Sequence, residues 1–279
     1  MTGYLRPTDL NDALGALKRG PLAVIAGGTD FFPARVERAP REDILDISGL
    51  SELRRIKIMP RYVRIGAGVT WSDLINVDLP ASFDGLKLAA REIGGIQIQN
   101  TATLVGNVCN ASPAADSLPN LLALDAEVEL ASLEGRRQMP IGEFVTGNRK
   151  TSRRSDELVT GLLVPNAGAG ARSDFLKLGG RKYLIISIVM IAIVIEAAQG
   201  MVERARVAVG ACSEIARRLP ALEAALLGQR FDASLSGAVE PAHLAHLSPI
   251  DDLRASAAYR RGAALVLLRR SLSRLGAAA

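Results

Sequence analysis

The chain has 279 residues, of which 48% are hydrophobic and 23% charged, as expected for a globular protein with a substantial core. Its formal net charge is +5, but the excess arginines are scattered in short pairs and aromatic residues make up only 4% of the chain. Because nucleic-acid binders more often cluster basic residues and interleave them with aromatics, we interpret the arginine pairs as solvated helix faces and subunit contacts.

The first fifty residues predict a βαβ-like unit. Residues 7–9 suit a helix cap, and the apolar residues that follow recur at helical spacing: Leu10, Ala13, Leu14 and Leu17. Gly20 ends this predicted helix. A short apolar run over residues 22–26 predicts a buried strand that stops at a glycine pair. A second apolar run over residues 44–47 completes the unit.

Residues 54–165 predict a mixture of strands and helices. The alternation of Ile56, Ile58, Val63 and Ile65 around residues 60–61 indicates a hairpin. Residues 97–119 contain unusually many small and polar side chains. The other expected elements are helices over 71–75, 83–93 and 121–124, and strands over 126–131, 137–141 and 158–164.

Residues 166–171, rich in glycine and alanine, form the best linker candidate. Beyond them, three apolar runs predict strands over 175–178, 184–197 and 205–211, and helices are expected over 219–227 and 252–275. For the last helix, Ser248 and Pro249 suit the N-cap and first positions. Strands followed by helices indicate an α+β C-terminal domain.

The cysteines and histidines argue against a metal centre in this chain. Cys109 and Cys212 form no C-x-x-C pair, so neither a zinc nor an iron–sulfur site is expected. His243 and His246 could bind a metal from one helix, but no third ligand is near in sequence.

The longest apolar run, residues 183–198, is too short to span a bilayer. We therefore expect a soluble, cytoplasmic protein.

A first glycine-centred loop, residues 26–30 with the sequence Ala-Gly-Gly-Thr-Asp, follows the strand over 22–26. Consecutive glycines let the backbone turn sharply and aim several N–H groups at one point, as a diphosphate requires. A tight turn without a ligand is an equally good interpretation of this loop alone. The P-loop pattern is absent, and Gly66-Ala67-Gly68 lacks the third glycine of a dinucleotide-binding loop.

A second loop follows Asn100, with Thr103, Gly106 and Asn107 offering a hydroxyl, an approachable backbone N–H and an amide. These groups suit phosphate and ribose oxygens. Asp116, just before a predicted helix, can accept from ribose or ribityl hydroxyls, or can serve simply as an N-cap.

In this order, the two loops resemble those of the FAD-binding medium subunits of the molybdenum hydroxylases, the family that includes carbon monoxide dehydrogenase and xanthine dehydrogenase. The family patterns are A-G-G-T-[DS] and [NT]-x-A-[TS]-[IL]-G-G-N-x-x-x-A-S-P-x-x-D. Residues 26–30 match the first pattern, and residues 100–116 match the second apart from Val105. Residues 177–182, 207–211 and 253–261 are similar to later family signatures, so the resemblance covers residues 4–275.

The resemblance implies an α+β chain: a two-part FAD-binding domain of the vanillyl-alcohol-oxidase-like (PCMH-type) fold, then a smaller C-terminal domain of antiparallel strands and helices. The implied bounds are 1–165, with subdomains near 1–53 and 54–165, and 172–279. Residues implied to bind FAD are Ala26, Gly27, Gly28, Thr29, Asp30, Ile93, Thr103, Val105, Gly106, Asn107, Asp116, Val159 and Lys177. The diphosphate would lie at the two loops, the sugar alcohol at Asp116 and the flavin near Lys177.

The same resemblance implies an electron-transfer oxidoreductase subunit rather than the substrate-oxidising one. A small subunit with iron–sulfur clusters would deliver electrons from a large subunit that holds the molybdenum cofactor, and FAD would pass them to NAD, a quinone, oxygen or another carrier. A dimer of heterotrimers is expected. The catalytic residues for the organic substrate would lie in another chain.

Two departures from the family pattern bear on the cofactor. Val105 replaces a glycine, so the loop must manage without φ > 0 freedom there. Leu184 and Ile185 stand where many relatives carry an aspartate or an aromatic residue. Two alternatives stay open: a stand-alone FAD-dependent reductase or oxidase of related fold, and an assembly protein that kept the fold and lost FAD.

Overall fold

The structure is a computed structural model that describes residues 3–35, 41–168, 170–181 and 185–278. The N-terminal part is a small parallel sheet in the order β1-β3-β2 beside helix α1. Its elements are β1 (Tyr4–Leu5), α1 (Leu10–Arg19), β2 (Ala23–Ile25) and β3 (Ile44–Asp46). Asp9 caps α1 by accepting from the N–H groups of Asn11 and Asp12. The predicted βαβ-like unit is confirmed, although β1 was not foreseen.

A second, antiparallel sheet has the strand order β4-β5-β10-β6-β7. Its strands are β4 (Ile56–Ile58), β5 (Tyr62–Gly66), β6 (Glu127–Ser132), β7 (Gly135–Pro140) and β10 (Leu158–Pro165). Directly paired residues share a face of the sheet, so Ile65, Leu162 and Val128 form one buried apolar row. The predicted hairpin over 56–65 is present, and the strands predicted over 126–131 and 137–141 form a second hairpin as β6 and β7.

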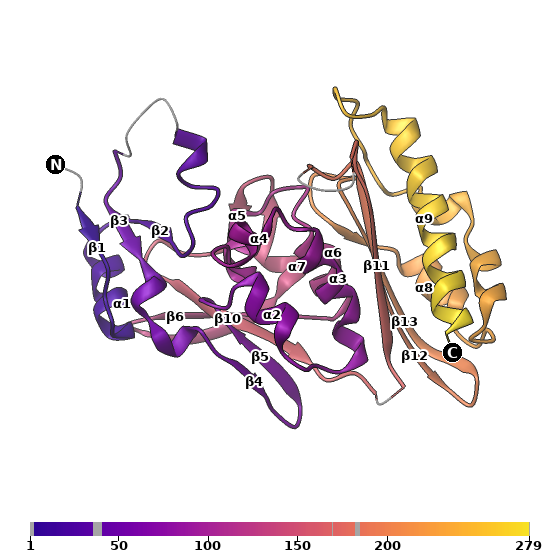
Figure 1. Ribbon diagram of the computed structural model, residues 1–279, viewed down its shortest axis with the longest axis horizontal. Helices are drawn as coiled ribbons and strands as arrows, with labels where there is room; N and C mark the ends of the chain where they lie inside the picture. Colours follow the sequence, from indigo (N-terminus) through magenta and orange to yellow (C-terminus); the bar gives the residue numbers. More distant parts are fainter. Residues whose placement is uncertain (1–2, 36–40, 169, 182–184, 279) are drawn as a thin grey trace.

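Short helices lie between this sheet and the C-terminal strands (Figure 1). They are α2 (Trp71–Asn76), α3 (Asp84–Glu92), α4 (Ile96–Gln99), α5 (Leu104–Asn110), α6 (Ser117–Ala123) and α7 (Ile141–Phe144). A small hairpin, β8 (Val145–Gly147) and β9 (Lys150–Thr151), follows α7. The 3-10 turns are Pro33–Arg35, Ile47–Gly49, Ser51–Leu53, Ala81–Phe83, Ala233–Ala238 and Pro241–Leu244.

The C-terminal part is an antiparallel sheet in the order β11-β12-β13-β14, with helices α8 and α9 on its outer face (Figure 1). Its elements are β11 (Arg172–Leu178), β12 (Val189–Ala198), β13 (Met201–Gly210), β14 (Arg217–Arg218), α8 (Pro220–Leu226) and α9 (Ala257–Ala277). Among the described helices, none combines the length and apolarity needed to cross a bilayer.

Strand β12 belongs to two hydrophobic cores at once. Met190, Ala192 and Val194 pack into the core shared with the N-terminal half. The alternate residues Val189, Ile191, Ile193 and Ile195 pack into the core beneath α8 and α9. A strand buried on both faces reads as a continuous apolar run, which is why this segment stood out in the sequence.

Several predicted boundaries were wrong, and the starts of β12 and α9 are two of them. The strand expected from residue 184 begins at Val189, and residues 182–184 lie outside the described residues. The last helix begins at Ala257, with Ser256 rather than Ser248 as its N-cap. Asp252 holds the preceding segment in a turn by accepting from the N–H groups of Arg254 and Ala255, so the helix cannot start earlier.

Candidate functional site

The structure brings the two predicted loops into contact. Residues 26–30 follow β2 and lie against the backbone at residues 101–102. A Cβ atom added at Gly27 would collide with the carbonyl group of Thr101, with the carbonyl carbon only 2.6 Å away. Gly28 has a φ of 64°, in the left-handed region that favours glycine. The glycine pair therefore permits both the close approach and the turn.

Backbone donors of the first loop have no protein partner. Within the described part of the chain, the N–H groups of Gly27, Gly28, Thr29 and Asp30 donate no hydrogen bond. The first three residues are half-buried and Asp30 is exposed. Buried or half-buried N–H groups are normally paired, so four consecutive free donors form a site suited to an anion.

The second loop differs from its prediction in two details. The N–H of Gly106, expected to be approachable, donates to Thr103 Oγ1 at 2.9 Å, because Thr103 is the N-cap of α5. Val105 lies in the first helical turn of α5 and is buried, so no positive φ is required at that position. The loop therefore manages without φ > 0 freedom at Val105, as the sequence requires. The Thr103 hydroxyl proton remains able to donate.

Asp116 and Lys177 form a buried ion pair, with 2.7 Å between Lys177 Nζ and Asp116 Oδ2. Ser187 donates its hydroxyl to the other carboxylate oxygen, also at 2.7 Å. Asp116 occupies the N-cap position of α6, but its side chain makes no capping hydrogen bond. Burial raises the pKa of the Asp116 carboxyl, opposed by the Lys177 charge and the two hydrogen bonds.

A hydrogen bond links the second loop to this ion pair. Ser117, the residue after Asp116, donates its hydroxyl to Asn107 Oδ1 at 2.6 Å. The site therefore runs from the free N–H groups at residues 27–30, through the contact with Thr101, to Asn107 and the Asp116–Lys177 pair. One end suits an anion and the other end suits hydroxyl groups.

The apolar candidates occupy different environments. Val159 is buried in β10, beside a bulge in its pairing with β6, and belongs to the core. Ile93 ends α3, is half-buried and packs against the same core. Ile185 is half-buried and lies against Gly179, whereas Leu184 lies outside the described residues.

Arg149 is a candidate site residue that the sequence analysis missed. Its Nη1 lies 2.8 Å from Asp30 Oδ2 and also donates to the side chain of Asn110, which ends α5. Its backbone has a φ of 58°, and its N–H donates to Ala111 O at 2.9 Å. Arg149 thus ties the first loop to the second, and it places a cation beside the free N–H groups. Ser187 was missed as well.

His243 and His246 each contact a backbone group. Among the residues that the structure describes, no cluster of three or more His, Cys, Asp or Glu side chains is arranged to hold a metal ion. His243 Nδ1 accepts from the N–H of Glu240, and His246 Nε2 lies 2.9 Å from Arg218 O.

Family comparisons bear directly on this site. Residues 1–167 match the FAD-binding domain of molybdopterin dehydrogenases, and residues 175–275 match the C-terminal domain of the CO dehydrogenase flavoprotein. The chain is 29% identical to the nicotine 6-hydroxylase medium subunit of Paenarthrobacter nicotinovorans, over 98% of this chain and 97% of that one. It is 30% identical to the glyceraldehyde dehydrogenase medium chain of Sulfolobus acidocaldarius, over 95% and 94% of the two chains.

A solved structure agrees with these matches. Reconstituted CO dehydrogenase from Oligotropha carboxidovorans contains a chain that superposes with a TM-score of 0.92 at 26% identity, covering 99% of this chain and 98% of that one. The resemblance seen in the loops is confirmed, and with it an FAD-dependent oxidoreductase subunit. The chain belongs to the family of FAD-binding medium subunits of the molybdenum hydroxylases.

Proposed function

We propose that this chain carries electrons within a molybdenum-containing hydroxylase or dehydrogenase, from the iron–sulfur clusters of a partner subunit to NAD, a quinone, oxygen or another acceptor. The contact between residues 26–30 and residues 101–102, which leaves four backbone donors free, is the observation that carries the proposal. It supports a resident cofactor with a diphosphate. Bound FAD can take up single electrons and release them in pairs.

The residues of this chain divide the work of holding FAD. The N–H groups of residues 27–30 would bind the diphosphate together with Thr103 and Asn107, and Ala26, Val105 and Gly106 would shape the two loops. Asp116 and Lys177 would hold the sugar alcohol and the edge of the flavin. Ile93 and Val159 would pack on the cofactor from the core side.

The proposal also includes the domain bounds of this chain and the partner subunits with which it assembles. We assign residues 1–165 to a vanillyl-alcohol-oxidase-like (PCMH-type) domain in two parts, 1–53 and 54–165, supported by its separate parallel and antiparallel sheets. Residues 172–279 form the second domain, supported by the core beneath α8 and α9. An iron–sulfur small subunit and a molybdenum-binding large subunit would complete a heterotrimer that dimerises, in the cytoplasm.

The test is purification of the full chain together with its co-expressed neighbours, followed by absorption spectroscopy and metal analysis. The proposal expects flavin bands and co-purifying chains with iron and molybdenum. It also expects flavin reduction when the substrate of the partner is added. Flavin without any partner chain would instead favour a stand-alone reductase. No flavin, even after FAD is added, would overturn the assignment and favour an assembly protein.

A further inference from the structure

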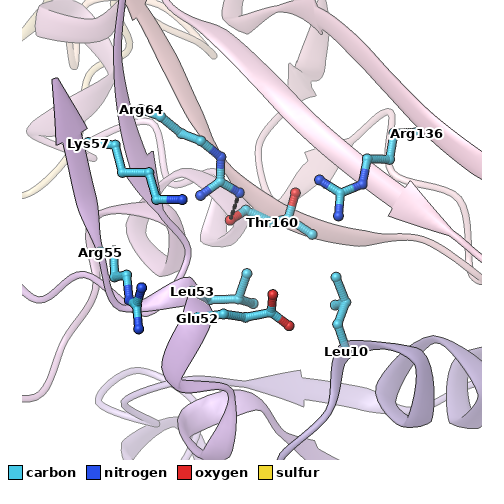
Figure 2. Close-up of a pocket in the computed structure, with 8 residues that line it drawn as sticks. All are labelled: Leu10, Glu52, Leu53, Arg55, Lys57, Arg64, Arg136 and Thr160. Atoms are coloured by element: carbon cyan, nitrogen blue, oxygen red, sulfur yellow. Dashed lines mark hydrogen bonds between the residues drawn. The ribbon is translucent and has the colours of Figure 1, made fainter. Parts of the chain in front are cut away.

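A basic pocket lies apart from the proposed FAD site, between α1, the turn Ser51–Leu53 and the antiparallel sheet (Figure 2). Its volume is about 370 Å³. The residues that line it are Leu10, Glu52, Leu53, Arg55, Lys57, Arg64, Arg136 and Thr160. None of them belongs to the set assigned to FAD. In Figure 2, the charged ends of Lys57 and Arg64 point toward that of Arg136 from opposite sides of the pocket.

Strand register explains why these cations share one face of the sheet. Lys57 on β4 pairs directly with Arg64 on β5, so both point away from the apolar row that contains Ile65. Arg136 on β7 pairs with Ala131, two residues from Glu129, so Arg136 and Glu129 also share a face. Leu10 and Leu53, both buried, supply an apolar floor.

Glu129, a carboxylate beside the pocket, already has hydrogen-bond partners in the protein. Glu129 accepts from Arg64 Nη2 at 2.6 Å and from the Thr160 hydroxyl at 2.5 Å. Although burial opposes ionisation, these hydrogen bonds hold the pKa of Glu129 below its usual value, so it stays charged. Arg136 reaches Glu129 only at 4.0 Å. Glu52 is the carboxylate that lines the pocket itself.

Two cationic side chains that line the pocket, those of Arg55 and Lys57, are available to bind a ligand. In the part of the chain that the structure describes, the side chains of Arg55 and Lys57 make no hydrogen bond or ion pair, and both residues are exposed. Together with Arg136, they leave positive charge in excess over Glu52. Guanidinium groups match the oxygen geometry of phosphate and carboxylate, and small-molecule pockets have volumes of roughly 300–1,000 Å³.

We propose that this basic pocket binds a small anion with closely spaced phosphate or carboxylate oxygens, of the class of pyrophosphate or a dicarboxylate. Arg55, Lys57 and Arg136 contact the anion, while Arg64 is held by Glu129 and keeps the cationic wall in place. The site is separate from FAD binding and does not depend on the electron acceptor.

The test is calorimetric titration of the FAD-saturated full chain with inorganic pyrophosphate at low ionic strength. Saturation with FAD keeps the probe out of the loops at residues 27–30 and 103–107. The proposal expects saturable binding at one site, weakened about tenfold or more by the double substitution Arg55→Gln/Lys57→Gln, because hydrogen bonds between charged groups are lost. Arg136→Gln is a second, single variant with the same expected direction.

A matched control removes the same charge elsewhere. Arg217→Gln/Arg270→Gln changes two exposed arginines of the C-terminal half, and binding should be unaffected. Equal weakening by the control would show general charge attraction and overturn the proposal. Absence of binding by pyrophosphate, ADP and succinate alike would also overturn it. Tighter binding of ADP would identify a nucleotide diphosphate as the source of the anion, and tighter binding of succinate a dicarboxylate.

Discussion

The two ends of the candidate FAD site present different chemical groups, backbone N–H groups at one end and charged side chains at the other. Residues 26–30 present backbone N–H groups and have no room for a side chain at Gly27. The other end presents buried charges on Asp116 and Lys177. The first end should therefore be most sensitive to added volume at Gly27, and the second end should be most sensitive to the loss of a single charge.

Breaking the buried pair should have the largest effect on stability. Lys177→Met leaves the Asp116 carboxylate buried without its cation, which should lower the free energy of unfolding by about 3–5 kcal/mol. Adding Asp116→Leu should restore most of that loss, because an apolar pair replaces an ionic one. Denaturant unfolding of the FAD-free chain measures both variants.

An exposed pair serves as the control for this experiment. Lys18 and Glu134 form an ion pair in which both side chains are more than half exposed, so Lys18→Met should leave stability unchanged. If Lys177→Met unfolds at the same denaturant concentration as Lys18→Met, the difference drawn between the two ends of the site is wrong.

Adding a single methyl group at the other end should have the next largest effect. Gly27→Ala forces residues 26–30 away from Thr101, so it should lower stability by about 1–3 kcal/mol and weaken FAD binding about tenfold or more. Gly262→Ala, in open space on α9, should be neutral or stabilising. Flavin fluorescence titration measures the affinity, and an unchanged affinity in Gly27→Ala would place the diphosphate elsewhere.

Arg149 tests whether the two loops must be tied together. Arg149→Ala removes the links to Asp30 and Asn110, and the ion pair is about half exposed, so stability should fall by less than about 1 kcal/mol. FAD binding should weaken about threefold to tenfold, because binding must then order the loops. Arg230→Ala, which removes another exposed ion pair, is the control. Equal FAD affinity in the two variants would remove Arg149 from the site.

A small dependence of stability on acid pH should come from Asp252, which lies outside the candidate FAD site. Hydrogen bonds from Arg254 and Arg260 lower the pKa of Asp252 to about 2. Because this folded-state pKa lies below the ordinary value of 3.8, the stability gained is present above pH 3.8 and is lost as pH falls toward about 2. Asp252→Asn should flatten the stability profile over that interval. If Asp252→Asn loses stability at acid pH just as the unaltered chain does, the acid dependence belongs to other carboxylates.

Much of the fold could be predicted because local patterns decide it. Apolar spacing and a cap residue identified α1, alternation identified the β4–β5 hairpin, and the glycine pair marked the loop after β2. The start of α9 could not be predicted this way, because Asp252 competes with the helix by binding nearby N–H groups.

Contacts between distant residues account for the parts of the site that the sequence did not reveal. Arg149 meets Asp30 across 119 residues, and Ser187 meets Asp116 across 71, with no local pattern to indicate either contact. The use of the Gly106 N–H within α5 was also hidden, since it depends on Thr103 acting as a cap. The roles of these residues toward FAD stay predictions.

The most direct test of the account is the flavin content of the Gly27→Ala complex, purified with its partner subunits and compared with the unaltered complex. The account predicts about one FAD per chain in the unaltered complex. It predicts strongly reduced flavin absorption in the variant, with iron and molybdenum content unchanged. Full flavin occupancy in the variant would contradict the assignment of the diphosphate to residues 27–30, and a flavin-free unaltered complex would contradict the proposed function itself.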